Sequence, residues 1–204
     1  MFHVKHEQVR DVGNWAGFET DPEQLSRLET LSDWLAGEAL VAGGIGPDEA
    51  PHVWERHVLD SLMFGAGLED PAWVLDVGTG VGLPGLPLAI VYPDVPFVLL
   101  DRSGRRVRLV RRIARILGVS NVEVIEADAH GWVESQDPLP CFVMRGVLQP
   151  EPLRGFASGH LAPGGSAVVG AGLEPAEVEG FELTRFPGSS VLEPGRWLRI
   201  MRQP

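Results

Sequence analysis

A glycine-rich segment between two apolar stretches constrains the fold of this chain more than any other feature. Residues 76–85 read Asp-Val-Gly-Thr-Gly-Val-Gly-Leu-Pro-Gly; they follow the apolar pair Val74–Leu75 and precede a helical stretch that extends to Val91. Either Pro84 or Pro87 suits the first turn of that helix, where a missing N–H group costs little. In an open α/β sheet, the turn between the first strand and its helix lies in the ligand crevice. The sequence therefore predicts a ligand site at this loop.

Beyond residue 73 the chain alternates short apolar segments with helical ones. Strands are predicted at residues 74–75, 97–100, 122–125, 142–144, 167–169, 181–186 and 197–201. An arginine-rich helix separates the second strand from the third, and another helix is predicted near 153–161. Such alternation is typical of a parallel, doubly wound α/β sheet. Turn residues Pro187-Gly188 and Pro194-Gly195 separate the last two strands, which predicts a C-terminal hairpin.

Two amphipathic helices are predicted before the sheet. Thr20-Asp21-Pro22-Glu23 matches a capping box with proline in the first turn, and leucines recur at helical spacing from there to Gly37. Turn residues at 43–47 separate this helix from a second one, predicted at 51–64. The first 19 residues show no clear period. We therefore expect a mobile arm over 1–19, a helical lid over 20–70 and a ligand-binding domain over 71–204.

The overall charge and the single cysteine exclude several classes of protein. The 204-residue chain carries 17 Lys+Arg and 28 Asp+Glu, a net charge of −11, which argues against nucleic-acid binding through bulk positive charge. Cys141 alone allows neither an intrachain disulfide nor a cysteine-only metal site, and it fits a reducing cytosol. Charged residues follow Met1–His6 directly, and no apolar run approaches the roughly 18 residues of a membrane span. We expect a cytoplasmic protein without a metal site or a membrane segment.

The acidity is concentrated at one end of the chain. Residues 1–75 hold 4 basic and 14 acidic residues, whereas residues 76–204 hold 13 and 14. The net charge therefore does not exclude an RNA partner. It predicts that an RNA contact is local, salt-sensitive and made mainly by the C-terminal domain.

Seven arginines lie close together after the second predicted strand, at positions 102, 105, 106, 108, 111, 112 and 115. Arg105, Arg108 and Arg112 recur at helical spacing, opposite apolar residues such as Val107 and Val110. Two interpretations stay open for these three arginines: the solvated face of a crossover helix, or a stripe that binds RNA phosphates.

The residues around the glycine loop indicate which ligand it holds. Gly80–Gly85 matches G-x-G-x-x-G, the fingerprint of dinucleotide-binding folds, so an NAD-dependent oxidoreductase is one candidate. Asp76 favours another ligand, because a carboxylate there would repel a pyrophosphate and attract the ammonium and sulfonium groups of S-adenosylmethionine. Asp101, at the end of the next strand, is placed to accept hydrogen bonds from two ribose hydroxyls. The donor-binding residues expected from this pattern are Asp76, Gly78, Thr79, Gly80, Gly82 and Asp101.

Two polar groups outside the loop each allow two interpretations. Asp128, after the third predicted strand, either recognises the amino edge of an adenine or caps a helix, and His130 either lines the crevice or is an exposed polar residue. Arg56 and Asp60 have the spacing of a helical salt bridge. Together with His57 they form either that bridge or a polar cluster facing the crevice.

Several segments resemble one known family. They are residues 56–62 (Arg-His-Val-Leu-Asp-Ser-Leu), residues 76–89, residues 99–108, where Leu-Leu-Asp precedes Gly-Arg-Arg-Val-Arg, and Gly195-Arg196. The Leu83-Pro84-Gly85 continuation of the loop is unusual among methyltransferases. Together these segments resemble the bacterial ribosomal RNA small subunit methyltransferase G family (RsmG), also called glucose-inhibited division protein B.

The resemblance implies a class I S-adenosylmethionine-dependent methyltransferase fold, a Rossmann-like doubly wound sheet with a short N-terminal helical extension. It also implies methyl transfer to N7 of a guanine in 16S rRNA of the small ribosomal subunit. In this family the donor is contacted near Gly78 and Leu83, at the pair matching Ala129 and His130, and at an arginine matching Arg145. We expect Arg145 to be the catalytic residue that orients the donor or the guanine, with a surface ion pair as the alternative for this arginine. We also expect the protein to act as a monomer.

The chain departs from the usual family residues at three places. It has Asp128-Ala129-His130 where Arg-x-Glu is usual, Met144-Arg145-Gly146 where Ser-Arg-Ala is usual, and Ala171-Gly172 where Lys-Gly is usual. These departures suggest a diverged methyltransferase-fold protein without turnover as an alternative. Methylation of a small molecule or a protein is a further alternative, which fits the acidic net charge.

Overall fold

The structure is a computed structural model, and it describes residues 2–146, 150–170, 181–186 and 197–203. The predicted turns Pro187-Gly188 and Pro194-Gly195 lie outside the described residues, as do Ala171-Gly172 and Gly195-Arg196.

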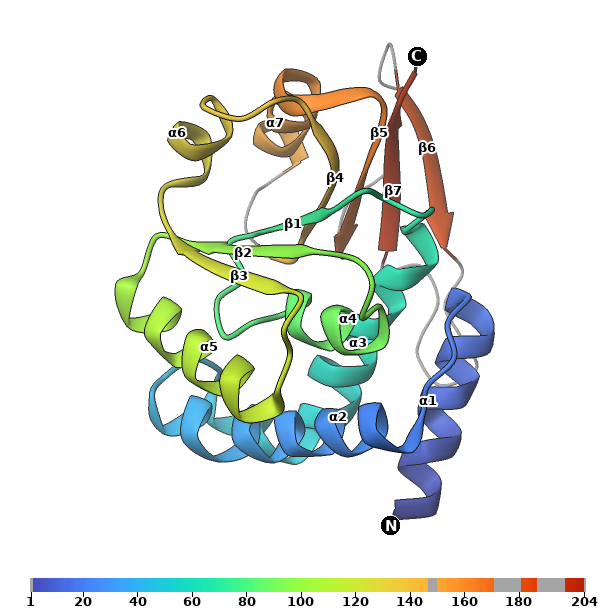
Figure 1. The fold of residues 1–204 in the computed structure, drawn as a ribbon, viewed down its shortest axis with the longest axis vertical. Coiled ribbons are helices and arrows are strands. Elements are labelled where there is room, and N and C mark those ends of the chain that lie inside the picture. Colours follow the sequence, from blue (N-terminus) through green and yellow to red (C-terminus); the bar gives the residue numbers. More distant parts are fainter. Residues whose placement is uncertain (1, 147–149, 171–180, 187–196, 204) are drawn as a thin grey trace.

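Within the described residues, a seven-stranded sheet forms the centre of the molecule (Figure 1). Its strands are β1 (Val74–Val77), β2 (Phe97–Asp101), β3 (Val122–Glu126), β4 (Leu139–Met144), β5 (Leu161–Gly170), β6 (Phe181–Phe186) and β7 (Trp197–Arg202). The strand order is β3-β2-β1-β4-β5-β7-β6; the first five strands run parallel, whereas β7 is antiparallel to both β5 and β6. The predicted doubly wound sheet and the C-terminal β6–β7 pair are both confirmed.

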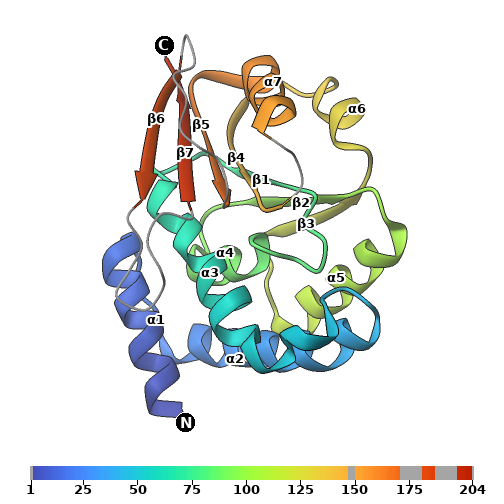
Figure 2. The ribbon, with the colours of Figure 1, turned by 180° about the vertical axis from the view of Figure 1, so that it is seen from behind.

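Helices cover both faces of this sheet (Figures 1 and 2). Helices α4 (Gly85–Val91) and α5 (Gly104–Leu117) lie on one face, and α6 (Ala129–Val133) and α7 (Pro150–His160) lie on the other. Successive strand residues point to opposite faces, so Leu99 belongs to the first apolar core and Leu100 to the second. Between the neighbouring strands β1 and β4 the connecting helices switch from one face of the sheet to the other. In open α/β sheets, the carboxyl ends of the strands at such a switch point form the ligand crevice.

Helix α1 (Phe2–Ala16) corrects the expectation of a mobile arm over residues 1–19. Its Val9 and Val12 are fully buried, and Gln8 accepts a hydrogen bond of 2.9 Å from the Trp54 indole N–H. The ammonium group of Lys5 lies 4.6 Å from the centre of a Trp54 ring. The helix is stabilised by contacts with residues about 45 positions away, and local periodicity carries no information on such contacts.

Helix α2 (Pro22–Trp34) begins one residue later than the predicted capping box. Asp21 is its N-cap, with Gln24 as the reciprocal partner: the Gln24 N–H donates to Asp21 Oδ1 at 2.8 Å and the Asp21 N–H donates to Gln24 Oε1 at 2.9 Å. A π-helical segment, η1 (Leu35–Ala39), continues the helix past the predicted end at Gly37.

The predicted second helix at 51–64 is a helical run of changing pitch rather than one α-helix. Its parts are η2 (Pro47–His52, 3-10), η3 (Trp54–Leu59, π), α3 (Asp60–Leu62) and η4 (Met63–Gly67, 3-10). Pro51 lacks an N–H group and lies inside η2, so an α-helical hydrogen-bond pattern cannot run through this first part of the segment. π-Helical turns occur frequently at functional sites.

The expected helical lid shares its core with the sheet domain. Leu28 and Leu31 of α2, Leu86 of α4 and Val107 of α5 belong to one buried apolar cluster, which also includes Val9 of α1. The N-terminal helices thus pack as a layer on the sheet domain.

Within the described ranges, no helix is both long enough and apolar enough to cross a membrane.

The burial of α1 makes a stability prediction. We expect Val9→Ala to lower the free energy of unfolding by about 2 kcal/mol, because a fully buried side chain loses two methyl groups. Urea unfolding followed by circular dichroism measures the change. Val4→Ala on the same helix is the matched control, since Val4 is 57% exposed and should change stability little. Equal, negligible effects of both variants would contradict the docking of α1.

Candidate functional site

A cavity of about 720 Å³ lies at the carboxyl ends of β1 to β4. Its walls are the loop after β1, the end of β2, the start of α6 and the residues that follow β4. The N-terminal region contributes Gly44, Ile45, Gly46 and His57. The volume falls in the range of sites that enclose a small organic ligand.

Nine of the predicted donor-binding residues line this cavity: Gly78, Thr79, Gly80, Leu83, Asp101, Asp128, Ala129, His130 and Arg145. Asp76 and Gly82 are not among the lining residues. The predicted residues that line the cavity come from four separate segments of the chain.

The glycine loop depends on two positions that exclude a side chain. Gly80 has φ +61°, a left-handed conformation, and its N–H donates to Asp101 Oδ2 at 2.9 Å. At Gly85 a Cβ atom would lie 2.2 Å from Leu99 Cδ2 and 2.6 Å from Asp76 Oδ2. Glycine therefore lets the first turn of α4 pack directly on β1 and β2. Helix α4 begins at Gly85, between the two prolines considered as its start.

Asp76 lies behind the loop, fully buried, rather than at the surface of the cavity. Its Oδ2 accepts hydrogen bonds from the Thr79 hydroxyl at 2.6 Å and from the Gly85 N–H at 2.8 Å. Burial raises the pKa of this carboxyl to about 7, an effect that the two hydrogen bonds oppose. The expected direct attraction of Asp76 for a sulfonium is therefore replaced by a different role, since Asp76 holds the glycine loop in shape.

Asp101 ends β2 with its carboxylate at the cavity, as the sequence predicts. The side chain is only 4% exposed, and its two oxygens accept from the Gly80 N–H at 2.9 Å and from the Ser103 N–H at 2.8 Å. Arg106 Nη1 lies 3.7 Å from Oδ2. A carboxylate has about four acceptor positions, so two hydroxyl donors are still accommodated.

Asp128 is the N-cap of α6, which confirms the helix-cap interpretation. Its Oδ1 accepts from the His130 N–H at 3.1 Å and from the Gly131 N–H at 3.3 Å. The residue also lines the cavity, together with His130 and Phe156, whose ring centres lie 5.4 Å apart. The start of α6 thus presents a carboxylate beside an aromatic surface.

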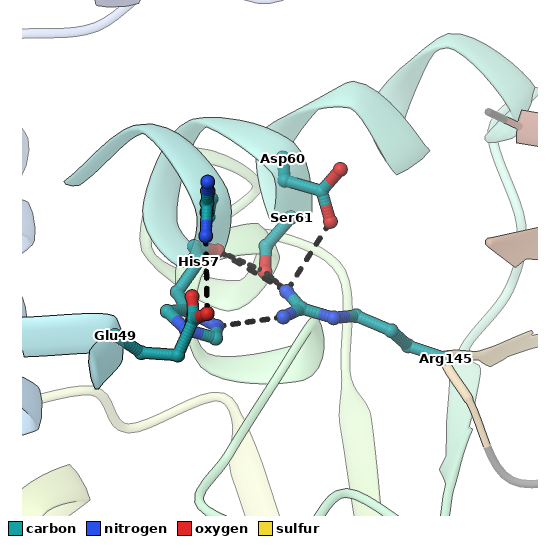
Figure 3. Close-up of polar contacts among 6 residues, drawn as sticks. Glu49, His57, Asp60, Ser61 and Arg145 are labelled. Carbon is teal, nitrogen blue, oxygen red and sulfur yellow. Dashed lines mark hydrogen bonds and ion pairs between the residues drawn. The ribbon is translucent and has the colours of Figure 1, made fainter. Parts of the chain in front are cut away.

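Arg145, the residue after β4, reaches a polar cluster on the N-terminal helices (Figure 3). Its Nη2 lies 2.7 Å from His57 Nδ1, and its Nη1 lies 3.3 Å from both Ser61 Oγ and Asp60 Oδ2. Arg56 pairs with Glu49, at 3.1 Å. Of the three residues in the predicted cluster, His57 lines the cavity beside Arg145, whereas Arg56 and Asp60 are not among the lining residues. The crevice-facing interpretation therefore holds for His57, and Asp60 joins it through its contact with Arg145.

Gly44, Ile45 and Gly46 are cavity residues that sequence reasoning missed, since residues 43–47 were interpreted only as a turn. Phe156 of α7 is another. At Gly44 a Cβ atom would lie 2.2 Å from Val81 Cγ1, so this loop packs closely on the glycine loop. The dense Gly-Gly-Ile-Gly pattern is the sequence signal that could have indicated this close packing of two loops.

The predicted RNA-binding arginines lie on the exposed side of α5, outside the cavity lining. Arg112 Nη1 forms an ion pair of 2.6 Å with Glu38 Oε1. Among the residues that the structure describes, Arg105 and Arg108 have no acidic partner within ion-pair distance. These two arginines are therefore the available cations of the stripe.

The buried carboxyl group of Asp76 leads to a prediction of how the stability of the protein depends on pH. The folded protein keeps a proton on this carboxyl up to about pH 7, whereas the unfolded chain releases it near the ordinary value of 3.8. Stability from this group is therefore fully present below about pH 4 and is lost as the pH rises through 7. The free energy of unfolding of the wild type should therefore fall by about 3 kcal/mol from this group between about pH 5 and pH 8. We expect Asp76→Asn to remove this part of the fall.

Urea unfolding at both pH values measures this difference. Asp33→Asn neutralises an exposed carboxylate instead and should keep the wild-type pH dependence. An unchanged profile in Asp76→Asn would show that the buried carboxyl does not retain its proton.

Solved structures share this fold. A putative O-methyltransferase from Klebsiella pneumoniae has a TM-score of 0.56 at 15% identity, over 91% of this chain and 92% of that one. A mutant of MtNAS in complex with S-adenosylmethionine has a TM-score of 0.59 at 15% identity, over 89% of this chain and 72% of that one. The chain therefore has the fold of class I S-adenosylmethionine-dependent methyltransferases, as predicted.

Sequence comparisons identify the family. Ribosomal RNA small subunit methyltransferase G of Mycobacterium leprae (strain Br4923) is 34% identical over 186 residues, 83% of this chain and 75% of that protein. The protein of the same name from Mycobacterium marinum is 42% identical over 106 residues, but this match spans about half of each chain, 52% and 46%. The family model described as GidB, rRNA small subunit methyltransferase G, matches residues 24–178. The match covers most of α2, the helical run that follows it, the glycine loop and the cavity. The chain belongs to the rRNA small subunit methyltransferase G family.

Proposed function

We propose that this protein transfers a methyl group from S-adenosylmethionine to N7 of a guanine in 16S rRNA. The observation that carries the proposal is the cavity at the carboxyl ends of β1 to β4, which joins the glycine loop, Asp101 and Arg145 in a member of this family. The relatives' names supply the RNA substrate, and the resemblance to the family supplies the N7 atom.

The residues present fit the methyl donor. Gly78 and Gly80 adopt φ values of +69° and +61°, so no Cβ atom obstructs the approach of a ligand to the loop backbone. Asp101 and Asp128 place carboxylates at two points of the same cavity. When bound, S-adenosylmethionine supplies an electrophilic methyl group on its sulfonium sulfur.

Different parts of the cavity then hold different parts of the donor. Asp101 accepts the ribose hydroxyls, the start of α6 at Asp128 to His130 holds the adenine, and the loop at Gly78–Gly80 holds the methionine portion. Arg145 orients the donor or the guanine from the end of β4. Guanine N7 carries an exposed lone pair and no proton, so positioning supplies the catalysis without a general base.

The substrate also bears on location and assembly. Ribosomal RNA is made and assembled in the bacterial cytoplasm, so we place the reaction there. The protein acts as a monomer in this proposal. The outer face of α5 is the surface that we assign to RNA phosphates.

Donor binding is the first prediction of this function. We expect the wild-type protein to bind S-adenosylmethionine and Asp101→Ala to weaken that binding roughly 10- to 100-fold, because hydrogen bonds to a charged group are lost. Isothermal titration calorimetry measures both affinities. Asp94→Ala is the matched control, since this exposed aspartate precedes β2 and does not line the cavity. Tight NADH binding without S-adenosylmethionine binding would instead support the oxidoreductase alternative.

Methyl transfer is the second prediction. Purified small subunits from a strain lacking the gene should gain one N7-methylguanine, mapped by borohydride and aniline cleavage. We expect Arg105→Glu/Arg108→Glu to lower kcat/KM for subunits at least about tenfold, with donor affinity unchanged, because phosphate contacts are lost.

Arg10→Glu is the control for this pair, since it reverses an exposed charge on α1, on the opposite side of the molecule from α5 (Figure 1). Persistence of the modification in the deletion strain would contradict the proposed function. Donor binding without any transfer would support the diverged relative without turnover.

A further inference from the structure

The guanidinium of Arg145 is held on two edges by the N-terminal helices. Nη2 contacts His57 Nδ1 at 2.7 Å, whereas Nη1 is shared between Ser61 Oγ, Asp60 Oδ2 and the His57 carbonyl oxygen at 3.3 to 3.5 Å (Figure 3). The side chain is 23% exposed, so most of it has left water. Within the described part of the chain these contacts engage only the two terminal nitrogens, which leaves the Nε edge of the guanidinium for a ligand.

The contact between Arg145 and His57 determines the protonation of the imidazole. A guanidinium only donates hydrogen bonds, so Nδ1 of His57 must be the acceptor and carry no proton. The neutral ring then has its proton on Nε2, and Glu49 Oε2 lies 3.2 Å from that atom. Arg145 thus donates to Nδ1 of His57, and the Glu49 carboxylate lies close to Nε2 on the other side of the ring, within ion-pair distance but without an aligned hydrogen bond.

The surroundings of His57 favour this neutral form. The residue is only 9% exposed, and burial together with the charges of Arg145 and Arg56 lowers its pKa, against the opposing effect of Glu49. These are the charged groups that act on the ring from η2, η3 and the end of β4. Lys5 of α1, which also packs on η3, lies over Trp54.

The backbone at His57 has a special conformation as well. His57 lies in the π-helical segment η3, where the wider turn changes the direction of its side chain relative to an α-helix. Its carbonyl oxygen accepts from the Ser61 hydroxyl and faces Arg145 Nη1. Both the ring and the main chain of this residue therefore contact the same guanidinium.

We propose that His57, in its neutral form with Glu49 behind it, is a positioning residue that holds the Arg145 guanidinium in one orientation at the donor cavity. The proposal rests on the proposed function, in which Arg145 contacts the donor or the guanine. Protonation of His57 would place its Nδ1–H group against an N–H group of Arg145 and a positive charge beside another. The Arg145 guanidinium would therefore lose its contact with His57 at acidic pH. His57 acts through Arg145 and does not itself take part in methyl transfer.

Nitrogen-15 NMR of the histidine rings tests the geometry without any activity. We expect the Nε2–H tautomer for His57 at about pH 7. Arg145→Met should raise the pKa of His57, because a neighbouring positive charge is removed, and Glu49→Gln should lower it, because a negative charge is removed. An Nδ1–H tautomer, a charged ring at neutral pH, or no response to either variant would overturn the proposal.

Donor affinity as a function of pH tests the consequence. We expect wild-type binding of S-adenosylmethionine to weaken below the pKa of His57. His57→Asn places an amide oxygen near the position of Nδ1, and this side chain cannot be protonated. The variant should therefore bind the donor within about threefold of wild type at neutral pH. It should not show the weakening of donor binding at acidic pH, which we call the acidic limb. His57→Leu should weaken binding or kcat/KM roughly tenfold. His52→Gln, at an exposed histidine five residues away on η2, is the matched control and should keep the wild-type profile.

A double-variant cycle separates positioning from a general structural effect. If His57 acts through Arg145, then Arg145→Met/His57→Leu should be no worse than Arg145→Met alone. Additive losses, or an acidic limb that persists in His57→Asn, would overturn the proposal. If the wild type failed to bind the donor at any pH, the proposed function would fail, whereas the NMR result would still decide whether His57 holds Arg145.

Discussion

The carboxyl group of Asp76 ties together the three pieces of backbone from which the site is built. It lies at β1, accepts a hydrogen bond from Thr79 in the loop and another from Gly85 in the first turn of α4. Burial makes the ionised carboxylate costly, which is why its pKa rises to about 7. The loop held in this way directs the Gly80 N–H to Asp101 at the end of β2. The donor cavity therefore depends on a residue that does not line it.

The N-terminal helices supply one wall of the same cavity. They share an apolar core with α4 and α5, and the loop at Gly44–Gly46 reaches the glycine loop. The π-helical segment η3 places His57 beside Arg145, although 88 positions separate the two residues. A helical segment that looks like a separate extension in the sequence is thus a part of the site in the fold.

The uneven charge of the chain has a structural consequence. Nearly all of the net negative charge belongs to residues 1–75, whose helices pack beside the arginine-rich α5. Glu38 from this acidic region pairs with Arg112, whereas Arg105 and Arg108 stay exposed nearer the start of α5. The acidic layer therefore neutralises part of the arginine stripe and leaves its N-terminal portion for an anionic partner.

The sequence by itself determined the class of the sheet, the glycine loop and the place of Asp101, because these follow from local periodicity and from the order of neighbouring strands. The resemblance to the family also indicated Arg145. Only the tertiary structure decided that Asp76 is buried, since this depends on the close packing of Gly85 against Leu99. Helix α1 likewise depends on its contact with Trp54. The orientation of the Arg145 guanidinium depends on its contacts with His57, Asp60 and Ser61. Contacts between distant segments arise when packed helices bring them together, and no short-range pattern encodes which segments will meet.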